Sequence, residues 1–298
     1  MNSRAQMRLL PDGRRLHLHD GPIDLIVEAF GELNAVERAY GAARARFETV
    51  LDELCGELPF LRQRCTPDSL WPRGSIARRM MAAALPYAGQ CFITPMAAVA
   101  GAVAEEILSA MVAAAQLSRA YVNDGGDIAL HLTESEKFVV GMIERPDRPS
   151  LFGTTILTSA IPVRGIATSG WRGRSFSLGI ADAVTVLAHR AAAADAAATI
   201  IANAVDLPGH PAVVRISACE LAPDSDLRDL LVTQAVGDLN AADVNEALAA
   251  GERTALRLLK IGLIHAAALH LRGETRLIGV SDSSMISTAV QERGLVHA

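Results

Sequence analysis

Two acidic motifs supply the oxygen atoms that could bind a metal ion or phosphate groups. The first, Asn123-Asp124-Gly125-Gly126-Asp127, places a carboxylate on each side of two consecutive glycines. Paired glycines permit backbone angles that other residues avoid, and they let a ligand approach the main chain. The same residues would also make an ordinary hairpin turn between two apolar strands, so the local pattern leaves turn and binding site as alternatives.

The second motif lies in an alanine-rich run that the sequence predicts to be helical from 191 to 205. Asp195 and Thr199 are four residues apart and therefore share one face of this helix. A buried polar group costs free energy unless it is paired, and a hard cation such as Mg²⁺ would pair both oxygens while leaving room for substrate phosphates. The alternative is a solvent-exposed face, on which neither residue needs a partner.

Two further segments have groups that suit an anion. The segment 165–170, which contains Thr168, Ser169 and Gly170, is predicted to be a loop after a strand, where hydroxyls and exposed amides could contact phosphate oxygens. Thr94 before Pro95 fits a helix N-cap with proline at the first helical position, which leaves amides free for an anion. An ordinary turn and an ordinary capped core helix are the respective alternatives.

The periodicity of the apolar residues predicts the elements that must position these motifs. Predicted strands cover 15–19, 23–27, 119–122, 128–132, 138–143, 154–157 and 182–188. Predicted helices cover 33–54, 76–85, 97–116 and 191–205, with an irregular connection over 57–73. From 226 to 270 the pattern predicts helix followed by helix, with His265 and His270 in the second, and then a closing strand over 275–280. This order indicates an α+β fold with a mixed, largely antiparallel sheet and buried alanine-rich helices.

Composition excludes several classes of partner. The 298 residues have a formal net charge of −5 without a long run of either sign, so we expect no nucleic acid and no membrane as partners. Aromatic residues make up only 4% of the chain, and stacking surfaces for a planar ring are scarce. A small nucleotide or phosphate ligand would therefore be held by local groups.

The cysteines and the N-terminal segment bear on the cellular compartment. None of the four cysteines forms a CxxC pair, so we expect reduced, buried thiols rather than a thiol-ligated metal site. The first residues lack an apolar signal segment, and the apolar stretch over 180–204 is interrupted by charged residues. The sequence therefore predicts a cytoplasmic protein.

The order of these motifs resembles the ApbE flavin-transferase family, once called thiamine-biosynthesis lipoproteins. The resemblance rests on the Gly-Gly-Asp turn between strands, the Ala167-Thr168-Ser169-Gly170 segment and the Ala194–Thr199 run, and it extends over 93–205. The chain looks most like a short cytoplasmic ApbE-like subfamily. The resemblance implies one domain over 1–298, with an N-terminal hairpin and helix (14–55), a motif-bearing core (91–205) and a C-terminal helical part with a closing strand (212–290).

The resemblance also implies a Mg²⁺-dependent enzyme that binds FAD, cleaves its pyrophosphate and passes FMN to a threonine of an acceptor protein. On this view Asp195 and Thr199 are the metal ligands, and Asn123, Gly125, Gly126 and Asp127 border the flavin nucleotide. Thr168, Ser169 and Gly170 would lie beside the phosphates. No residue is assigned as the nucleophile.

Two departures from the family pattern keep a second hypothesis open. The family's His-x-x-Asp-Pro-x-x-Gly segment is replaced by 171–182, which contains no histidine, and Ala100-Gly101 stands where the family has Lys-Gly. Arg172 and Arg174 could contact a phosphate instead, or could be solvated. The chain is thus either an FMN transferase or FAD pyrophosphatase, or a non-catalytic flavin, nucleotide or phosphate carrier or assembly factor. Its alanine-rich helices would suit a homodimer as well as packing within one subunit.

Overall fold

A large antiparallel sheet forms the centre of the computed structural model, which describes residues 4–143, 151–279 and 286–287, here called the described residues. Its nine strands lie in the order β1-β2-β3-β4-β5-β8-β9-β12-β13, and every neighbouring pair is antiparallel. These strands are β1 (Gln6–Leu9), β2 (Leu16–Asp20), β3 (Ile23–Phe30), β4 (Arg119–Asp124), β5 (Asp127–Leu132), β8 (Gly165–Ser169), β9 (Ala183–Ala188), β12 (Ala266–Leu271) and β13 (Glu274–Ile278).

Two small sheets accompany the large one. One pairs β10 (Val213–Ser217) with β11 (Leu231–Val236), and the other contains β6 (Lys137–Ile143), β7 (Leu151–Thr158) and β14 (Ile286–Ser287). The helical elements are α1 (Leu33–Leu61), α2 (Ser75–Ala84), η1 (Leu85–Tyr87), η2 (Pro95–Ala98), α3 (Val99–Ala114), α4 (Ala191–Ala204), α5 (Ala218–Leu221) and α6 (Ala241–Lys260).

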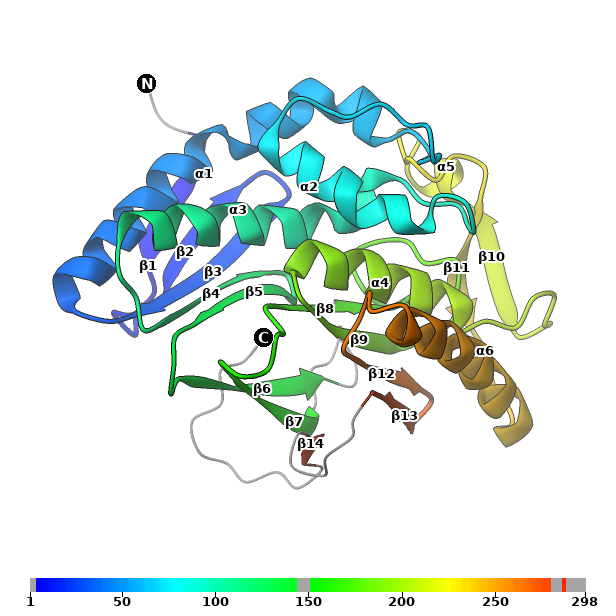
Figure 1. Cartoon of the computed structure of the whole chain (residues 1–298). Coiled ribbons are helices and arrows are strands. Elements are labelled where there is room, and N and C mark those ends of the chain that lie inside the picture. Colours follow the sequence, from blue (N-terminus) through cyan, green and yellow to red (C-terminus); the bar gives the residue numbers. More distant parts are fainter. Residues whose placement is uncertain (1–3, 144–150, 280–285, 288–298) are drawn as a thin grey trace.

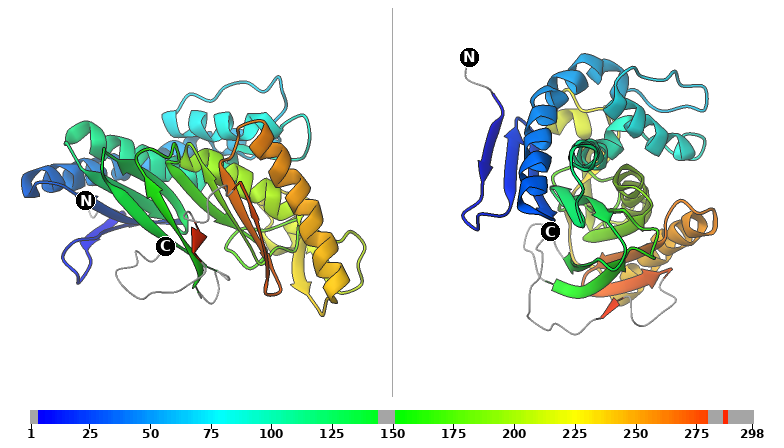
Figure 2. Two further views of the ribbon diagram at one scale, coloured as in Figure 1. Left: turned by 60° about the horizontal axis from the view of Figure 1, so that its bottom comes forward. Right: turned by 60° about the vertical axis from the view of Figure 1, so that its left-hand side comes forward.

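The helices and the β6–β7 hairpin cover opposite faces of the large sheet, as Figures 1 and 2 show. Helices α1, α3, α4 and α6 lie on one face, here called the helix face, and α2 packs outside α3 and α4. The hairpin packs on the other face, here called the hairpin face. Because side chains alternate along a strand, Val122 of β4 belongs to the helix-face core while its neighbour Tyr121 belongs to the hairpin-face core.

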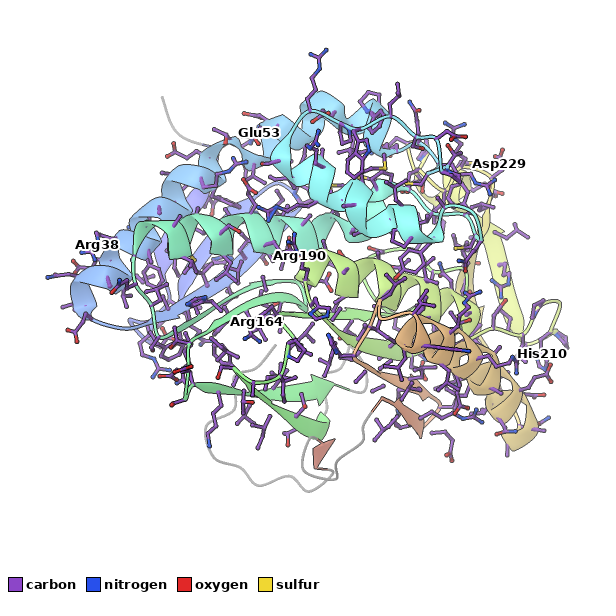
Figure 3. All side chains as sticks on the ribbon, in the orientation of Figure 1. Arg38, Glu53, Arg164, Arg190, His210 and Asp229 are labelled. Carbon is purple, nitrogen blue, oxygen red and sulfur yellow. The ribbon has the colours of Figure 1, made fainter. Side chains whose placement is uncertain are left out.

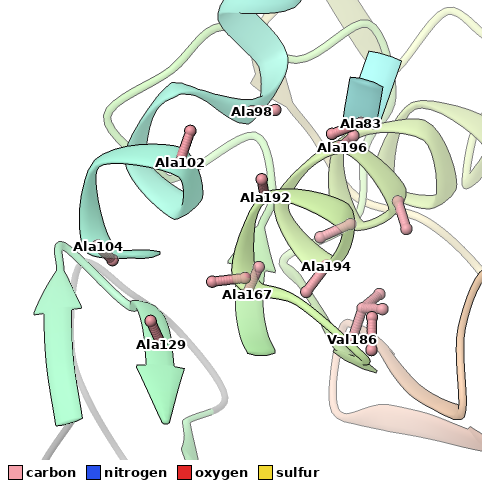
Figure 4. Packing of buried hydrophobic residues seen from close by; sticks show 14 of the residues in the cluster. Ala83, Ala98, Ala102, Ala104, Ala129, Ala167, Val186, Ala192, Ala194 and Ala196 are labelled. Atoms are coloured by element: carbon pink, nitrogen blue, oxygen red, sulfur yellow. The ribbon is translucent and has the colours of Figure 1, made fainter. Parts of the chain in front are cut away.

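Small residues bring α3 and α4 close to each other and to the sheet. Figure 4 shows α3, with Ala102 and Ala104, beside α4, with Ala192 and Ala194, and Ala129 of β5 and Ala167 of β8 on the sheet below the two helices. A Cβ atom at Gly101 would lie 2.4 Å from the Ala191 carbonyl oxygen, so only glycine fits at this crossing. The prediction of buried alanine-rich helices is confirmed.

Several predicted elements are confirmed, and some boundaries are corrected. The predicted hairpins correspond to β2–β3 and β4–β5, and the predicted helices over 33–54, 76–85, 97–116 and 191–205 correspond to α1, α2, η2 with α3, and α4. Helix α1 continues to Leu61 through Pro59, so the first part of the connection expected over 57–73 is helical.

Two predicted elements are wrong. The Gly165–Ser169 segment is strand β8, not a loop, because it pairs with both β5 and β9. The region from 226 to 270 is not helix followed by helix: it contains β11, α6 and β12, and His270 lies in β12. Alanine-rich sequences favour helices, but here the run 266–268 pairs with β9 and β13 in the sheet, and these tertiary contacts decide its conformation. The predicted closing strand is β13, and Val280 lies outside the described residues.

The Thr94 side chain does not cap the following helix, although Pro95 occupies the first helical position as predicted. Its hydroxyl instead donates a hydrogen bond to the carboxylate of Asp226. Cys65 is buried as predicted, whereas Cys55 is exposed.

One described helix, Pro95–Ala114, is long and apolar enough to cross a membrane by length and composition alone. In this fold it packs against α1, α4, β4 and β5, which accounts for its apolar character.

Candidate functional site

The glycine pair forms the tight turn that joins β4 to β5. Asn123 Oδ1 accepts a hydrogen bond from the Gly126 amide at 2.8 Å, and Gly125 and Gly126 have φ angles of +64° and +111°. Asp124 and Asp127 are cross-strand partners on either side of this turn. The segment is therefore a hairpin turn, as one of the two alternatives predicted, and this turn also brings two carboxylates together.

Both carboxylates lie on the helix face of the sheet. Asp124 is two residues from Val122 and Asp127 is two residues from Ala129, and both of these apolar residues belong to the helix-face core. Asn123 lies on the opposite face, where it lines a small apolar pocket with Tyr121 and residues of β5 and β6. Asn123 therefore shapes the turn and does not share a face with the carboxylates.

Helix α4 contributes Asp195 to the same region. Its carboxylate accepts the Gly101 amide at 3.0 Å, within the first turn of α3. Arg190, labelled in Figure 3, precedes the first residue of α4 where this helix begins beside α3. Thr199, one turn further along α4, is half-buried like Asp195. The alternative that Asp195 and Thr199 lie on a fully solvent-exposed face is therefore wrong.

Three aspartates in this region, Asp124, Asp127 and Asp195, all have raised pKa values, and charges within this group contribute to the shifts. Burial raises the pKa of Asp124 to about 7. Burial, together with the negative charges of Asp195 and Asp124, holds the pKa of Asp127 well above its ordinary value. Burial and the charge of Asp124 raise the pKa of Asp195 to about 7, although the amides of Gly101 and Ala100 act in the opposite direction. We call these three residues the acidic site.

Asp124 was not among the predicted binding residues. The signal for it was present in the Asp-Gly-Gly-Asp order, because a two-residue turn places its flanking residues opposite each other on one face. Only the second aspartate of this order was assigned to the site from the sequence.

Arg172 and Arg174, which look equivalent in the sequence, have different surroundings. Arg172 is half-buried, pairs with Asp182 at 2.9 Å and stacks over Trp171 at 4.2 Å. Arg174 is exposed, and its Nη2 atom would lie 2.4 Å from a Cβ atom at Gly125. Its charge lowers the pKa values of Asp124 and Asp127, against the larger effect of burial. Arg174 therefore lies at the acidic site, and Arg172 supports the chain that leads to it.

The Thr168-Ser169-Gly170 segment reaches the acidic site only in part. The Thr168 amide donates to Asp127 Oδ1 at 3.2 Å, but the Thr168 hydroxyl lies 2.9 Å from the hydroxyl of Thr185. Alternation along β8 puts Thr168 on the hairpin face and Ser169 on the helix face, with Asp127. A Cβ atom at Gly170 would lie 2.4 Å from the Asp182 carbonyl oxygen, so this glycine serves close backbone packing.

Asn203 extends the polar face of α4, and it was not predicted from the sequence. Its Oδ1 accepts hydrogen bonds from the Leu178 amide at 2.9 Å and from the Ser177 hydroxyl at 3.2 Å. Asp195, Thr199 and Asn203 are spaced four residues apart, which is the pattern that could have revealed this stripe. The loop formed by residues 171–179 therefore lies beside the glycine turn at Arg174 and is hydrogen-bonded to Asn203 of α4 through Ser177 and Leu178.

The oxygen atoms at the acidic site fit a magnesium ion whose remaining ligands would be phosphates and water. Within residues 4–143, 151–279 and 286–287, no group of three or more His, Cys, Asp or Glu side chains could hold a metal. Mg²⁺, however, commonly binds through only one or two carboxylates together with substrate phosphates. Asp127 and Asp195 supply carboxylate oxygens whose mutual repulsion a cation would relieve, and Thr199 offers a hydroxyl one turn along α4.

Curated relatives match part of the chain. A UPF0280 protein of Methanopyrus kandleri is 39% identical over 150 residues, covering 50% of this chain and 56% of the relative. A UPF0280 protein of Methanothermobacter thermautotrophicus is 40% identical over 155 residues, and the match again spans 56% of the relative. A third, from Methanospirillum hungatei, is 34% identical over 191 residues, covering 60% of this chain and 70% of the relative. The chain thus spans little more than half the length of the first two relatives.

A solved structure and a family model also match this chain. The structure, described as the apo form of Pseudomonas stutzeri flavinyl transferase ApbE, is similar with a TM-score of 0.34 and 12% identity, over 86% of this chain and 77% of that one. The family model, described as "AbpE bacteria", matches residues 7–277. Since this match includes nearly all of the sheet and its helices, the chain belongs to the ApbE-like family that the model describes.

Proposed function

We propose that this protein binds FAD or a related nucleotide at the acidic site, where the carboxylates would hold Mg²⁺ and the metal would neutralise the phosphates. One observation carries the proposal. The carboxylates of Asp127 from β5 and Asp195 from α4 lie close enough for the charge of Asp195 to raise the pKa of Asp127. Residues that are distant in sequence and share such a perturbed ionisation are candidates for a functional site.

Individual residues then have distinct tasks. Asp127, Asp195 and Thr199 would hold the metal, and Arg174 beside Gly125 would contact a phosphate. The open space around Gly126, where a Cβ atom would meet nothing within 4 Å, leaves the backbone accessible to a ligand. A bound Mg²⁺ supplies neutralisation of the phosphate charge and of the charge on the leaving group.

The reaction that suits this arrangement is cleavage of the FAD pyrophosphate. With water as the acceptor, the products are FMN and AMP, which is an FAD pyrophosphatase reaction. With a threonine hydroxyl of an acceptor protein, the products are an FMN ester of that protein and AMP, which is an FMN transferase reaction. Both reactions need the same phosphate site, and they differ only in the acceptor.

A non-catalytic binding protein is the second candidate, and a specific observation favours it. Within 171–182, which replaces the family's histidine-containing segment, Asp182 accepts hydrogen bonds from the Trp171 ring nitrogen, Arg172 Nε and the Arg272 amide. This segment is thus used for structural contacts. A protein that keeps the phosphate site without the histidine would serve as a nucleotide carrier or assembly factor.

Calorimetric titration with FAD, with and without Mg²⁺, followed by chromatography for FMN and AMP, separates these candidates. Metal-dependent binding with FMN and AMP as products supports the enzyme, and metal-dependent binding without products supports the carrier. Absence of binding of FAD, FMN and ADP would rule out both.

A matched pair of variants tests the metal ligands. Asp195→Asn removes a charge but keeps an oxygen that can accept the Gly101 amide, so we expect a stable fold without Mg²⁺-dependent binding. Glu105→Gln makes the same change at a carboxylate that accepts the Ala192 amide instead, and it should retain Mg²⁺ dependence. Equal behaviour of the two variants would remove Asp195 from the metal site.

A further inference from the structure

The two-stranded β10–β11 sheet lies at the C-terminal end of α4 (Figure 1). Two of its polar side chains meet there, because the Nη1 atom of Arg215 in β10 lies 3.4 Å from the hydroxyl of Thr233 in β11. Thr233 is buried, and Arg215 forms an ion pair with Asp206, which follows α4. Buried polar groups need partners, and the further partners of Arg215 and Thr233 lie in the loop 171–179.

The last three residues of this loop all donate their carbonyl groups to the small sheet as acceptors. The Thr233 amide donates to the Ser177 carbonyl at 2.8 Å, and the Thr233 hydroxyl donates to the Gly179 carbonyl at 2.7 Å. The guanidinium of Arg215 donates to the carbonyl of Leu178, which lies between them. The small sheet therefore binds the segment 177–179 through its main chain and does not depend on the side chains of that segment.

Helix α4 binds the same segment from another side. Asn203 accepts the Leu178 amide at 2.9 Å and the Ser177 hydroxyl at 3.2 Å. A Cβ atom at Gly179 would lie 2.1 Å from the Ala202 carbonyl oxygen, so the segment approaches α4 as closely as a glycine allows. The segment 177–179 is thus fixed between α4 and the small sheet.

Arg174 reaches the acidic site from the exposed tip next to this fixed segment. The exposed residues of the loop are 173–176, and the tip is held at its first end by Arg172, which pairs with Asp182. At its second end the tip continues directly into Ser177. Arg174 precedes Ser177 by three residues and lies against Gly125, so a shift of the segment 177–179 would move the Arg174 guanidinium relative to the acidic site.

We propose that Thr233 and Arg215 are positioning residues, which hold the segment 177–179 so that Arg174 faces a phosphate bound at the acidic site. This inference rests on the proposed function, because it needs Arg174 to contact a phosphate. Neither Thr233 nor Arg215 has to touch the ligand. They act on affinity because a ligand group that is held in place before binding loses less conformational freedom when the ligand arrives.

A double-mutant cycle with inorganic pyrophosphate tests this role. Its dissociation constant would be measured by calorimetry with Mg²⁺ for the wild type, Thr233→Val, Arg174→Ala and the variant with both substitutions. Thr233→Val keeps the shape of the side chain but removes the hydroxyl that binds the Gly179 carbonyl, so we expect binding to weaken by about fivefold. When Arg174 is already alanine, Thr233→Val should weaken binding no further, because the loop then offers no guanidinium to position.

Two more variants separate positioning from a general loss of stability. Thr233→Ser keeps the hydroxyl and should bind pyrophosphate as the wild type does. Arg215→Lys keeps a positive charge beside Asp206, but a single ammonium group cannot reproduce the two guanidinium nitrogens that bind Asp206 and the Leu178 carbonyl. It should therefore weaken binding in the wild type and, like Thr233→Val, have no further effect in Arg174→Ala.

Thr133→Val is the matched control, because the Thr133 hydroxyl also donates to a backbone carbonyl, that of Ser118, at 2.8 Å. Thr133 follows the last residue of β5, whereas Asp127 of the acidic site is the first residue of this strand. The control should therefore leave the dissociation constant of pyrophosphate unchanged.

The possible results distinguish this inference from the proposed function. Unchanged pyrophosphate binding in Thr233→Val, or the same weakening by Thr233→Val with and without Arg174, would overturn the positioning role alone. An Arg174→Ala variant that binds pyrophosphate normally would remove both Arg174 from the phosphate site and the inference that depends on it. A wild-type protein that binds neither pyrophosphate nor FAD overturns the proposed function as well.

Discussion

Asp195 and Glu105 each bind the first turn of the helix to which the other belongs. Asp195 of α4 accepts the Gly101 amide of α3 at 3.0 Å, and Glu105 of α3 accepts the Ala192 amide of α4 at 2.9 Å. A carboxylate at a helix N-terminus satisfies free amides and interacts favourably with the helix dipole. The two helices are thus joined by reciprocal caps, and one of these caps is also part of the acidic site.

Loss of the Glu105 cap should weaken this helix pair. We expect Glu105→Ala to lower the free energy of unfolding by about 1–2 kcal/mol, because the Ala192 amide loses its acceptor. Glu105→Gln retains an acceptor oxygen and should lose less. Urea denaturation followed by circular dichroism measures the free energy of unfolding of both variants. Equal losses would show that the hydrogen bond from the Ala192 amide contributes nothing to stability.

The close crossing of α3 and α4 should not tolerate a side chain at Gly101. We expect Gly101→Ala to cost roughly 2–3 kcal/mol of stability, since its Cβ atom would lie 2.4 Å from the Ala191 carbonyl oxygen. Gly56→Ala is the matched control, because Gly56 is also helical but a Cβ atom there meets nothing within 4 Å. That variant should be neutral, or more stable by up to about 1 kcal/mol. Similar melting temperatures for the two variants would contradict the close approach of α3 and α4 at Gly101.

The glycine turn should be sensitive in a different way. Gly125→Ala and Gly13→Ala both put a side chain on a backbone with positive φ, +64° and +68°, so each should lose about 1–2 kcal/mol of stability. Only at Gly125 would the new methyl group displace the Arg174 guanidinium. We therefore expect weaker pyrophosphate binding in Gly125→Ala and normal binding in Gly13→Ala, measured by calorimetry with Mg²⁺. Normal binding in both would remove Arg174 from the phosphate site.

The acidic site should make the fold less stable as the pH rises. Asp124 has a pKa of about 7 in the folded chain against an ordinary value of 3.8, so between about pH 4 and 7 it is protonated when folded and ionised when unfolded. Unfolding then releases a proton, and stability falls with increasing pH across this window. Asp127 and Asp195, whose pKa values are also raised, act in the same direction.

This pH dependence can be measured in the presence of a chelator. We expect the free energy of unfolding of the wild type to fall between pH 5 and pH 8. The corresponding fall in Asp124→Asn should be smaller by roughly 1–3 kcal/mol. The exposed carboxylate of Asp68 provides the control, since Asp68→Asn should keep the wild-type slope. If Asp124→Asn also keeps that slope, the carboxyl of Asp124 does not have a raised pKa.

The sequence was most informative where local pattern and tertiary environment agree. The sequence pattern predicted the first residue of α1, both ends of α4 and the turn between β4 and β5 close to their observed positions. Prediction failed where pairing with distant strands decides the conformation. The 165–169 segment joins β5 and β9, and the alanines of β12 lie between β9 and β13, so neither could be recognised from neighbouring residues alone.

The candidate site shows the same division. Asp195 and Thr199 were predicted as site residues because polar groups on an apolar helix need partners, and Asp127 because it follows the glycine pair. The separate roles of Arg172 and Arg174 could not be predicted, because two arginines in one loop have the same local pattern. Their roles depend on Asp182 and Gly125, which other parts of the chain bring to them.

By itself, the sequence determined the chemical types at the site and the helix or strand that bears most of them, since both depend on short-range spacing. Only the tertiary structure decided that burial and the charges of Asp195 and Asp124 raise the pKa of Asp127, and that burial and the charge of Asp124 raise the pKa of Asp195. Electrostatic interaction depends on distance in space and on burial, and both are set by the packing of α4 against α3 and the sheet.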